Sequence, residues 1–153
     1  MIKEITQKEV KEAIAQDVLN DLSEWFGIPE YTKDYILQSQ SMPFFAAMDQ
    51  GQAVGFVSLK ETSPYTLEIY CMGIKKSHHR QRFGKQLIEA AEIYAKAHNY
   101  HFLQVKTVVM GKYKTYDQTN LFYKSVGFLE LEVFPTLWDE WNPCQILVKS
   151  MKE

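Results

Sequence analysis

The stretch that decides the fold is residues 74–87, which read IKKSHHRQRFGKQL. It combines lysine, histidine and arginine with one glycine and ends on an apolar residue. An apolar run, Leu67–Ile74, leads into it, and Gly84–His98 continues with apolar residues at steps of three or four. The pattern predicts a strand, a basic turn and an amphipathic helix, in that order.

The basic turn has the features of an anion site. The start of a helix offers unsatisfied backbone amides and a partial positive charge. Arg80, Arg82 and Lys85 would reinforce both, and Gly84 allows a ligand to approach the backbone closely. Two interpretations are open from these residues alone: a phosphate site, or a solvated basic turn.

The rest of the chain alternates between strand and helix patterns. Two strand-like runs flank Gln50–Gln52 and predict a hairpin. No repeat, low-complexity tract or linker divides the chain, so we expect one domain over residues 1–153. The predicted fold class is α/β (α+β), with a mixed, mostly antiparallel, twisted sheet of six to seven strands flanked by about four helices. The expected strands are 2–6, 44–49, 53–60, 67–74, 101–109, 128–134 and 145–151, and the expected helices are 7–26, 31–38, 84–98 and 120–125.

Composition and charge exclude several classes of protein. With 153 residues, 46% hydrophobic and 24% charged, the chain fits one globular domain. Its net charge of -2 supplies no general basic field, so we expect no nucleic-acid partner. We find no apolar leader segment or membrane span, and we therefore expect a cytoplasmic protein without a membrane partner. The histidines lack partners at metal-ligand spacing, which predicts no metal.

Two ordered motifs resemble the GNAT superfamily of N-acetyltransferases. The family's acetyl-CoA motif is Gln/Arg-x-x-Gly-x-Gly/Ala, and it corresponds here to His79–Gly84. Gly84 matches, whereas Arg82 replaces the first glycine and His79 the leading Gln/Arg. The segment Asn120–Phe128 reads NLFYKSVGF and resembles the later family signature, in which an Asn precedes Phe-Tyr and Gly-Phe follows. The resemblance implies a single GNAT-like domain that binds acetyl-CoA.

The resemblance also implies where acetyl-CoA binds as co-substrate. Pantetheine would lie along the strand before the turn, where amides near Met72 and Gly73 would polarise the thioester carbonyl and stabilise the oxyanion. The turn itself would hold the pyrophosphate. The implied cofactor contacts are Met72, Gly73, Ile74, His79, Arg80, Gln81, Arg82, Phe83, Gly84, Lys85, Asn120 and Tyr123.

Two residues are the candidate catalytic groups. Glu68 lies six residues before Ile74, a position that resembles the catalytic Glu of the histone-acetylating branch, and would accept the proton of the attacking amine. The alternative roles of Glu68 are to order water or to pair with a cation. Tyr123 resembles the family's Tyr that protonates the departing thiolate; outside this context it would be an aromatic packed beside Phe122. Asn120 has a helix cap as its alternative role.

The acceptor side is less defined. Trp25–Tyr31 and Phe134–Trp141 are aromatic and acidic segments at the places where relatives form acceptor walls, the second as a loop between the last two strands. Rings and carboxylates there would hold a cationic amine. Alternatively the tryptophans cover the edge of the core and the acids face water. Met110–Tyr116 is either a loop that closes over cofactor or substrate, or a solvated connection. The candidate substrate contacts are Trp25, Glu30, Tyr31, Trp138 and Asp139.

The leading hypothesis is direct acetyl transfer from acetyl-CoA to a primary amine of a small molecule or protein, in a ternary complex. The alternative is a catalytically silent acetyl-CoA-binding sensor or interaction module, which the replacement at Arg82 keeps open. The identity of the acceptor amine and the oligomeric state are not fixed by the sequence, which is compatible with a homodimer.

Overall fold

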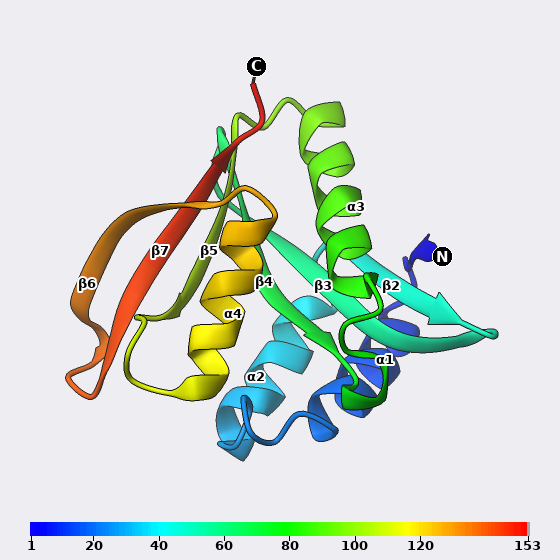
Figure 1. Cartoon of the computed structure of the whole chain (residues 1–153). Coiled ribbons are helices and arrows are strands. Elements are labelled where there is room, and N and C mark those ends of the chain that lie inside the picture. The colour runs from blue at the N-terminus through cyan, green and yellow to red at the C-terminus, as the bar shows by residue number, and fades with distance from the viewer. Residues whose placement is uncertain (153) are drawn as a thin grey trace. The chain divides into compact units, whose positions relative to one another are not determined.

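The computed structural model describes residues 1–152, and their strands and helices are drawn in Figure 1. Within this range seven strands form one sheet in the order β1-β2-β3-β4-β5-β7-β6. The predicted fold class, a mixed, mostly antiparallel sheet with four α-helices, is confirmed. The elements are β1 (Ile2–Glu4), α1 (Lys8–Asn20), α2 (Pro29–Ser39), β2 (Phe44–Asp49), β3 (Gln52–Ser63), β4 (Thr66–Ile74), the short 3₁₀ helix η1 (Lys76–His78), α3 (Phe83–Ala97), β5 (Phe102–Val108), α4 (Lys114–Ser125), β6 (Leu129–Asp139) and β7 (Asn142–Ser150).

The predicted hairpin is confirmed as the antiparallel pair of β2 and β3. The register runs from Phe44 opposite Ser58 to Asp49 opposite Gln52. Between these strands, Gln50 and Gly51 have φ of 51° and 79°, the left-handed region that tight hairpin turns require. The strand, turn and helix predicted around residues 74–87 are present as β4, η1 and α3.

The predicted end of the first helix is wrong. The expected helix runs to residue 26, whereas α1 ends at Asn20 and residues 21–25 form turns. The amides of Leu22 and Trp25 bond to carbonyls three residues back, at Leu19 and Leu22. Because such tight turns keep a step of about three, they still place Leu22 and Trp25 against the core. The apolar spacing therefore continues past the end of the helix.

Two further boundaries differ from the predictions. The helix predicted over 120–125 begins earlier, at Lys114, so part of the connection expected over 110–116 is helical. The last connection, expected as a loop over 134–141, is mostly strand. β6 extends to Asp139, which pairs with Asn142 of β7 across a tight turn.

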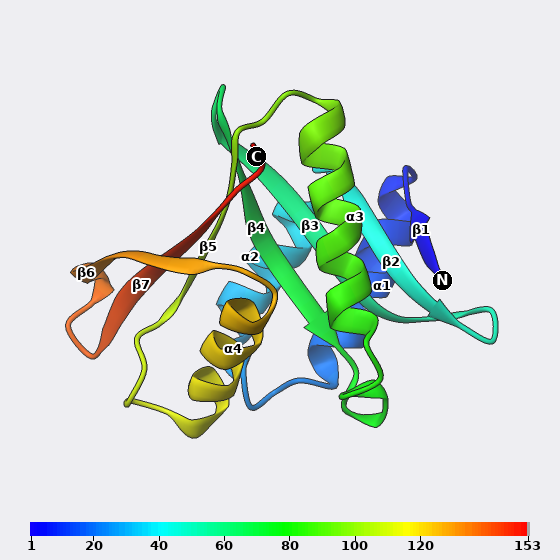
Figure 2. The same cartoon turned by 45° about the horizontal axis from the view of Figure 1, so that its top comes forward.

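Contacts divide the chain into two compact units, residues 1–60 with 69–94, and residues 61–68 with 95–153. The prediction of one domain over residues 1–153 stays a prediction, and each unit is described by itself. In the first unit α1 packs on one face of the sheet, against Phe44, Phe56 and Cys71. Phe45 points to the opposite face, where the centroid of its ring lies 6.0 Å from that of Tyr94 of α3. Figure 2 shows these helices on the two faces of the strands.

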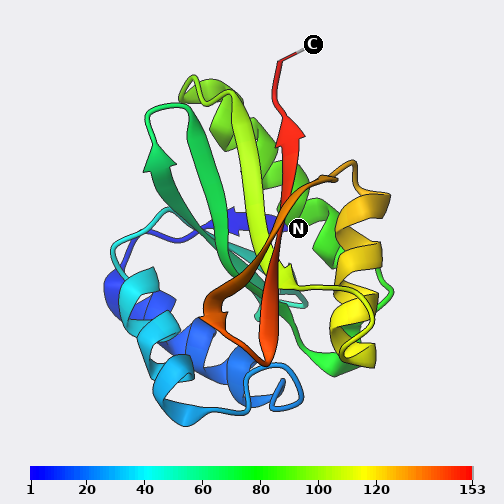
Figure 3. The same cartoon turned by 90° about the vertical axis from the view of Figure 1, so that its left-hand side faces the viewer.

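The second unit is built on β5, β7 and β6 with α4 beside them (Figure 3). β7 pairs antiparallel with both neighbours. Its core includes Leu103, Leu147 and Phe128, each at most 1% exposed. Across residues 1–152, no helix is long and apolar enough to cross a membrane.

Candidate active site

The base of the basic turn is held by acidic side chains of the first unit. Lys75 Nζ lies 2.6 Å from the Asp17 carboxylate, and Lys76 Nζ lies 3.0 Å from Glu24. The Lys76 amide also donates to Asp21 Oδ2 over 2.7 Å. The hydrogen bond from Lys76 lowers the pKa of the Glu24 carboxyl, and Glu24 in turn raises the pKa of Lys76. These two lysines therefore anchor the turn to α1 and the segment after it.

The two histidines of the turn are also anchored. His79 Nε2 donates to the Ile74 carbonyl over 2.6 Å, and its ring meets Trp25 edge-on at 5.8 Å. His78 Nε2 lies 2.9 Å from Asp49 Oδ2, and its Nδ1 lies 2.7 Å from the Ser77 hydroxyl. His79, which stands where the family motif has Gln or Arg, thus ties the turn to the end of β4. The structure brings it together with Trp25, a candidate acceptor contact.

The backbone of the turn takes a conformation that glycine favours, although the residues are arginines. Arg80 has φ of 63° and Arg82 has φ of 70°. The left-handed region costs a residue with a side chain roughly 1–2 kcal/mol. Arg82 therefore keeps the backbone shape expected of the motif glycine that it replaces. A sequence comparison detects the replacement but gives no sign that the conformation survives it.

The start of α3 completes the turn. The Gln86 amide bonds to the Arg82 carbonyl over 3.0 Å, which closes the first helical turn. Phe83 is half-buried, with its ring 5.7 Å from His78, and Gly84 is half-buried as the second residue of α3. The remaining predicted contacts here are exposed, and they are Arg80, Gln81, Arg82 and Lys85. The charges of Arg80, Arg82 and Lys85 are presented at the end of the helix that attracts anions.

The end of β4 is packed too closely for side chains at two glycines. A Cβ on Gly73 would lie 2.8 Å from a Leu22 methyl and 3.2 Å from a Val18 methyl, so a larger residue there would require these side chains to shift. A Cβ on Gly55 of β3 would lie 2.9 Å from the Gly73 carbonyl. Met72 and Ile74, on either side of Gly73, are half-buried. Sequence reasoning missed Gly55, because its role depends on which strand lies beside it.

In the second unit, Glu68 is buried in an ion pair. Its side chain is 7% exposed, and Oε1 lies 3.1 Å from Lys106 Nζ. Gln104 Nε2 donates to the same oxygen over 3.0 Å. The contact with a cation, one of the alternatives for Glu68, is therefore present, and its role as a base stays a prediction. Gln104 and Lys106 were missed; their spacing of two on a predicted strand is the signal that places both on one face.

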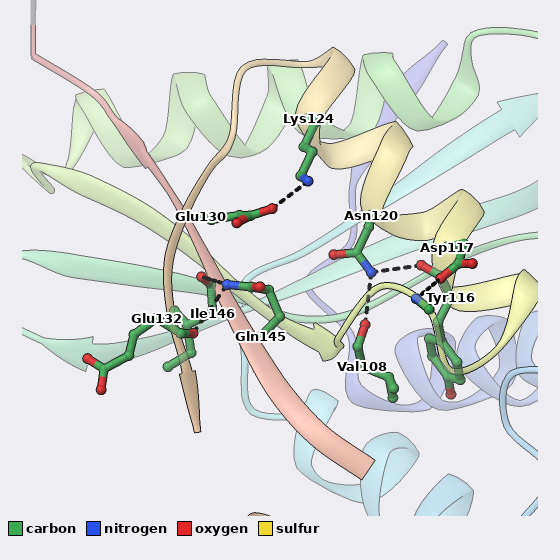
Figure 4. Close-up of polar contacts among 10 residues, drawn as sticks. Val108, Tyr116, Asp117, Asn120, Lys124, Glu130, Glu132, Gln145 and Ile146 are labelled. Atoms are coloured by element: carbon green, nitrogen blue, oxygen red, sulfur yellow. Dashed lines mark hydrogen bonds and ion pairs between the residues drawn. The ribbon is translucent and has the colours of Figure 1, made fainter. Parts of the chain in front are cut away.

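Asn120 lies in the middle of α4, six positions after its first residue, Lys114, so its alternative role as a helix cap is wrong. Nδ2 donates to the carbonyls of Val108 and Tyr116, both over 2.8 Å (Figure 4). Because both acceptors are carbonyls, the orientation of the amide is fixed. Oδ1 is buried and has no hydrogen-bond partner among residues 1–152, as is also true of Thr107 Oγ1. Buried acceptors of this kind usually have a partner, which a bound molecule can supply.

Tyr123 lies one turn further along α4 and is 6% exposed. Its ring meets Phe122 at 5.3 Å and Phe128 at 5.5 Å, both edge-on. Its carbonyl accepts the Phe128 amide over 3.0 Å, which closes the end of the helix. The aromatic packing beside Phe122, which was the alternative role of Tyr123, is present. The transfer of a proton from Tyr123 to the thiolate stays a prediction.

The candidate acceptor residues fall in both units. Trp25 is half-buried against the core of the first unit, while Glu30 and Tyr31 are exposed at the start of α2. In the second unit Trp138 is 45% exposed. Asp139 Oδ1 accepts the amides of Trp141 and Asn142, both over 2.9 Å, so this carboxylate shapes the turn between β6 and β7.

An aromatic cluster of the first unit was missed by sequence reasoning. Tyr35 of α2 meets Phe26 at 5.8 Å and Tyr70 of β4 at 5.4 Å, both edge-on. Lys60 Nζ lies 5.7 Å from the centroid of the Tyr70 ring. These residues are separated in sequence, so only the fold brings them together. In the described part of the chain, no cluster of three His, Cys, Asp or Glu side chains could hold a metal ion.

A basic turn between a strand and a helix, in a mixed and mostly antiparallel sheet, is the arrangement that the resemblance implies. Residues 12–128 match the model of the acetyltransferase (GNAT) family. The chain therefore belongs to the GNAT family of acetyltransferases. A search of curated proteins gives no match.

Solved structures share the fold at low sequence identity. An aminoglycoside 6'-N-acetyltransferase complexed with coenzyme A is 16% identical, with a TM-score of 0.79 over 100% of this chain and 98% of that chain. The aminoglycoside 6'-N-acetyltransferase from Enterococcus faecium is 16% identical, with a TM-score of 0.80 over the same shares. An IAA acetyltransferase from Bacillus cereus is 20% identical, with a TM-score of 0.73 over 98% of each chain. At these identities the similarity shows the fold alone.

Proposed function

We propose that this protein transfers the acetyl group of acetyl-CoA directly to a primary amine of a small molecule or protein, in a ternary complex. The observation that carries the proposal is the backbone of the turn, where Arg82 keeps a glycine-like φ of 70° directly before α3. Two structural neighbours are named as N-acetyltransferases of aminoglycosides, which supports an amine as the acceptor.

The turn would bind the pyrophosphate of the cofactor. The first amides of α3 point along the helix axis toward an anion, and Arg80, Arg82 and Lys85 are exposed beside them. Lys75 and Lys76 are engaged by Asp17 and Glu24, so they would hold the turn in place while the arginines contact phosphate.

The cofactor's thioester would be polarised by backbone amides at the end of β4, near Met72 and Gly73. The amine nitrogen attacks the thioester carbonyl carbon, the carbon–sulfur bond breaks, and the amine loses a proton. In our assignment Glu68 accepts that proton, and the Tyr123 hydroxyl gives its own to the departing thiolate. The unpartnered Asn120 Oδ1 would accept a hydrogen bond from an amide of the cofactor.

A second candidate function is a silent sensor that binds acetyl-CoA without turnover. The ion pair between Glu68 and Lys106 favours it, because a carboxylate held by an ammonium and by Gln104 already has partners for its charge. The two functions differ in whether CoA is released when amines are supplied.

The test is CoA release measured with a panel of primary amines, with acetyl-CoA affinity measured in parallel. We expect turnover by the natural chain, and we expect Tyr123→Phe to lower kcat by about 100-fold with unchanged acetyl-CoA affinity. Tyr65→Phe is the matched control, since Tyr65 is 58% exposed on the turn between β3 and β4. Acetyl-CoA binding without turnover on any amine would favour the sensor, and an unchanged kcat in Tyr123→Phe would remove Tyr123 from the mechanism.

A further inference from the structure

The hairpin of β2 and β3 is tied to the basic turn by a chain of three polar side chains. His78 of η1 has a partner at each ring nitrogen: Nε2 lies 2.9 Å from Asp49 Oδ2, at the end of β2, and Nδ1 lies 2.7 Å from the Ser77 hydroxyl. A carboxylate only accepts hydrogen bonds, so Nε2 donates its hydrogen to Asp49. In the neutral ring, Nδ1 then accepts the hydrogen of the Ser77 hydroxyl. Both nitrogens are therefore satisfied, and the orientation of the ring is fixed.

The contact between His78 and Asp49 is better shielded from water than one of the ion pairs that hold the turn to the segment after α1. The side chains of His78 and Asp49 are 22% and 39% exposed. Those of Lys76 and Glu24 are 49% and 46% exposed. Because water and salt weaken exposed pairs most, the contact with the hairpin is the more durable of the two. Two parts of the first unit therefore hold the turn, and the hairpin is one of them.

The His78 ring also contacts the first residue of α3. Its centroid lies 5.7 Å from that of Phe83, in an edge-on arrangement. Phe83 directly follows Arg82, whose carbonyl accepts the Gln86 amide and closes the first turn of the helix. A shift of the His78 ring would therefore displace the residue at which α3 begins. The backbone amides that the start of the helix offers to an anion would move with it.

The charge of Asp49 by itself would disfavour an anionic ligand at the turn. A carboxylate repels a pyrophosphate, so electrostatics gives no reason for an acidic side chain beside this turn. The hydrogen bond to His78 gives a reason, because it fixes the ring that packs on Phe83. The effects of charge and of position at Asp49 therefore have opposite signs on anion affinity, and an experiment can separate them.

We propose that Asp49 and His78 are positioning residues for acetyl-CoA, which hold the basic turn and the start of α3 in the conformation that receives the pyrophosphate. This inference rests on the proposed function, because it takes the turn as the cofactor site. Neither residue needs to contact the cofactor in this role: Asp49 acts through His78, and His78 acts through Phe83. The end of β2, which lies outside both sequence motifs, thereby contributes to cofactor recognition.

The test compares two substitutions of Asp49 by calorimetric titration of the full chain with acetyl-CoA. Asp49→Asn and Asp49→Leu remove the same charge, but the Asn side-chain oxygen can still accept the hydrogen bond from His78, whereas Leu cannot. We expect Asp49→Leu to bind acetyl-CoA about fivefold more weakly than Asp49→Asn. Glu89→Leu is the matched control, because Glu89 is exposed on α3 in the same unit. It loses the same charge and should bind no more weakly than the natural chain.

The possible results separate this inference from the proposed function. Equal affinities of Asp49→Asn and Asp49→Leu, with binding by the natural chain, would overturn the positioning role and leave the cofactor site in place. No binding by the natural chain would overturn both. Melting temperatures of the same variants exclude a merely structural effect, because lower stability alone leaves the affinity of the folded chain unchanged well below Tm.

Variants of His78 cover the case in which Asp49→Leu fails to fold. His78→Gln keeps an amide that can donate to Asp49, whereas His78→Leu has no donor, so His78→Gln should bind acetyl-CoA about threefold more tightly than His78→Leu. Because Asp49 acts through His78, adding Asp49→Leu to His78→Leu should cause no further loss of affinity. Equal binding by the two His78 variants, or additive losses in the double variant, contradicts the proposal.

Discussion

The basic turn and the contact between α4 and β5 hold their polar groups in opposite ways. In the turn, Arg80 and Arg82 are exposed, and ion pairs such as that of Lys75 with Asp17 fix the base of the loop. In the second unit, Asn120 is fully buried and bonds to the Val108 carbonyl. Charges in water are screened by salt, whereas a buried hydrogen bond is not. The turn should therefore respond to salt and backbone changes, and the buried contact to loss of its side chain.

The largest expected effect lies at the buried contact. Asn120→Leu removes the donor to the Val108 carbonyl, and leaving a buried carbonyl unpaired costs about 2 kcal/mol. For a chain of this size we expect Tm to fall by roughly 4–8 °C in a thermal scan. Lys124→Met is the control on the same helix, because it breaks only the exposed pair with Glu130 and should cost less than about 1 kcal/mol. An equal fall of Tm in the two variants would contradict the expected difference between buried and exposed contacts.

A smaller effect separates charge from backbone shape in the turn. Arg82→Gly and Arg82→Gln both remove the charge, so each should weaken acetyl-CoA binding by about threefold at low salt and less at high salt. Only glycine relieves the left-handed conformation, so Arg82→Gly should be more stable than Arg82→Gln by about 1 kcal/mol. Calorimetric affinities at two salt concentrations and Tm values give both quantities. Equal stabilities would mean that φ of 70° at residue 82 carries no cost.

Periodicity predicted those parts of the fold that depend on local spacing. β2, the hairpin to β3 and the sequence of β4, turn and α3 were correct, because alternation and helical spacing are properties of neighbouring residues. The end of α1 was misplaced, since the tight turns at Leu22 and Trp25 continue the same apolar spacing. Residues 134–141 were expected as a loop, because Pro135 hides the alternation in residues 134–139.

The candidate site was predictable only where it follows a motif. The turn and the later segment could be located from His79–Gly84 and Asn120–Phe128, and both lie within the residues that match the family model. The partners of Glu68 could not be located from the sequence, because its contacts with Gln104 and Lys106 depend on which strands lie side by side. The left-handed backbone conformation of Arg82 could not be predicted either, because an arginine at a glycine position predicts a different backbone conformation.

The most direct test of the account is a calorimetric titration with acetyl-CoA of the natural chain, Gly84→Trp and Ile93→Trp. Gly84 is the second residue of α3, whereas Ile93 is 70% exposed further along the same helix, so the two variants add the same bulk at different places. We predict that the natural chain and Ile93→Trp bind, and that Gly84→Trp binds at least about tenfold more weakly because its indole blocks the anion site. No binding by the natural chain, or equal binding by Gly84→Trp, would contradict cofactor binding at the turn.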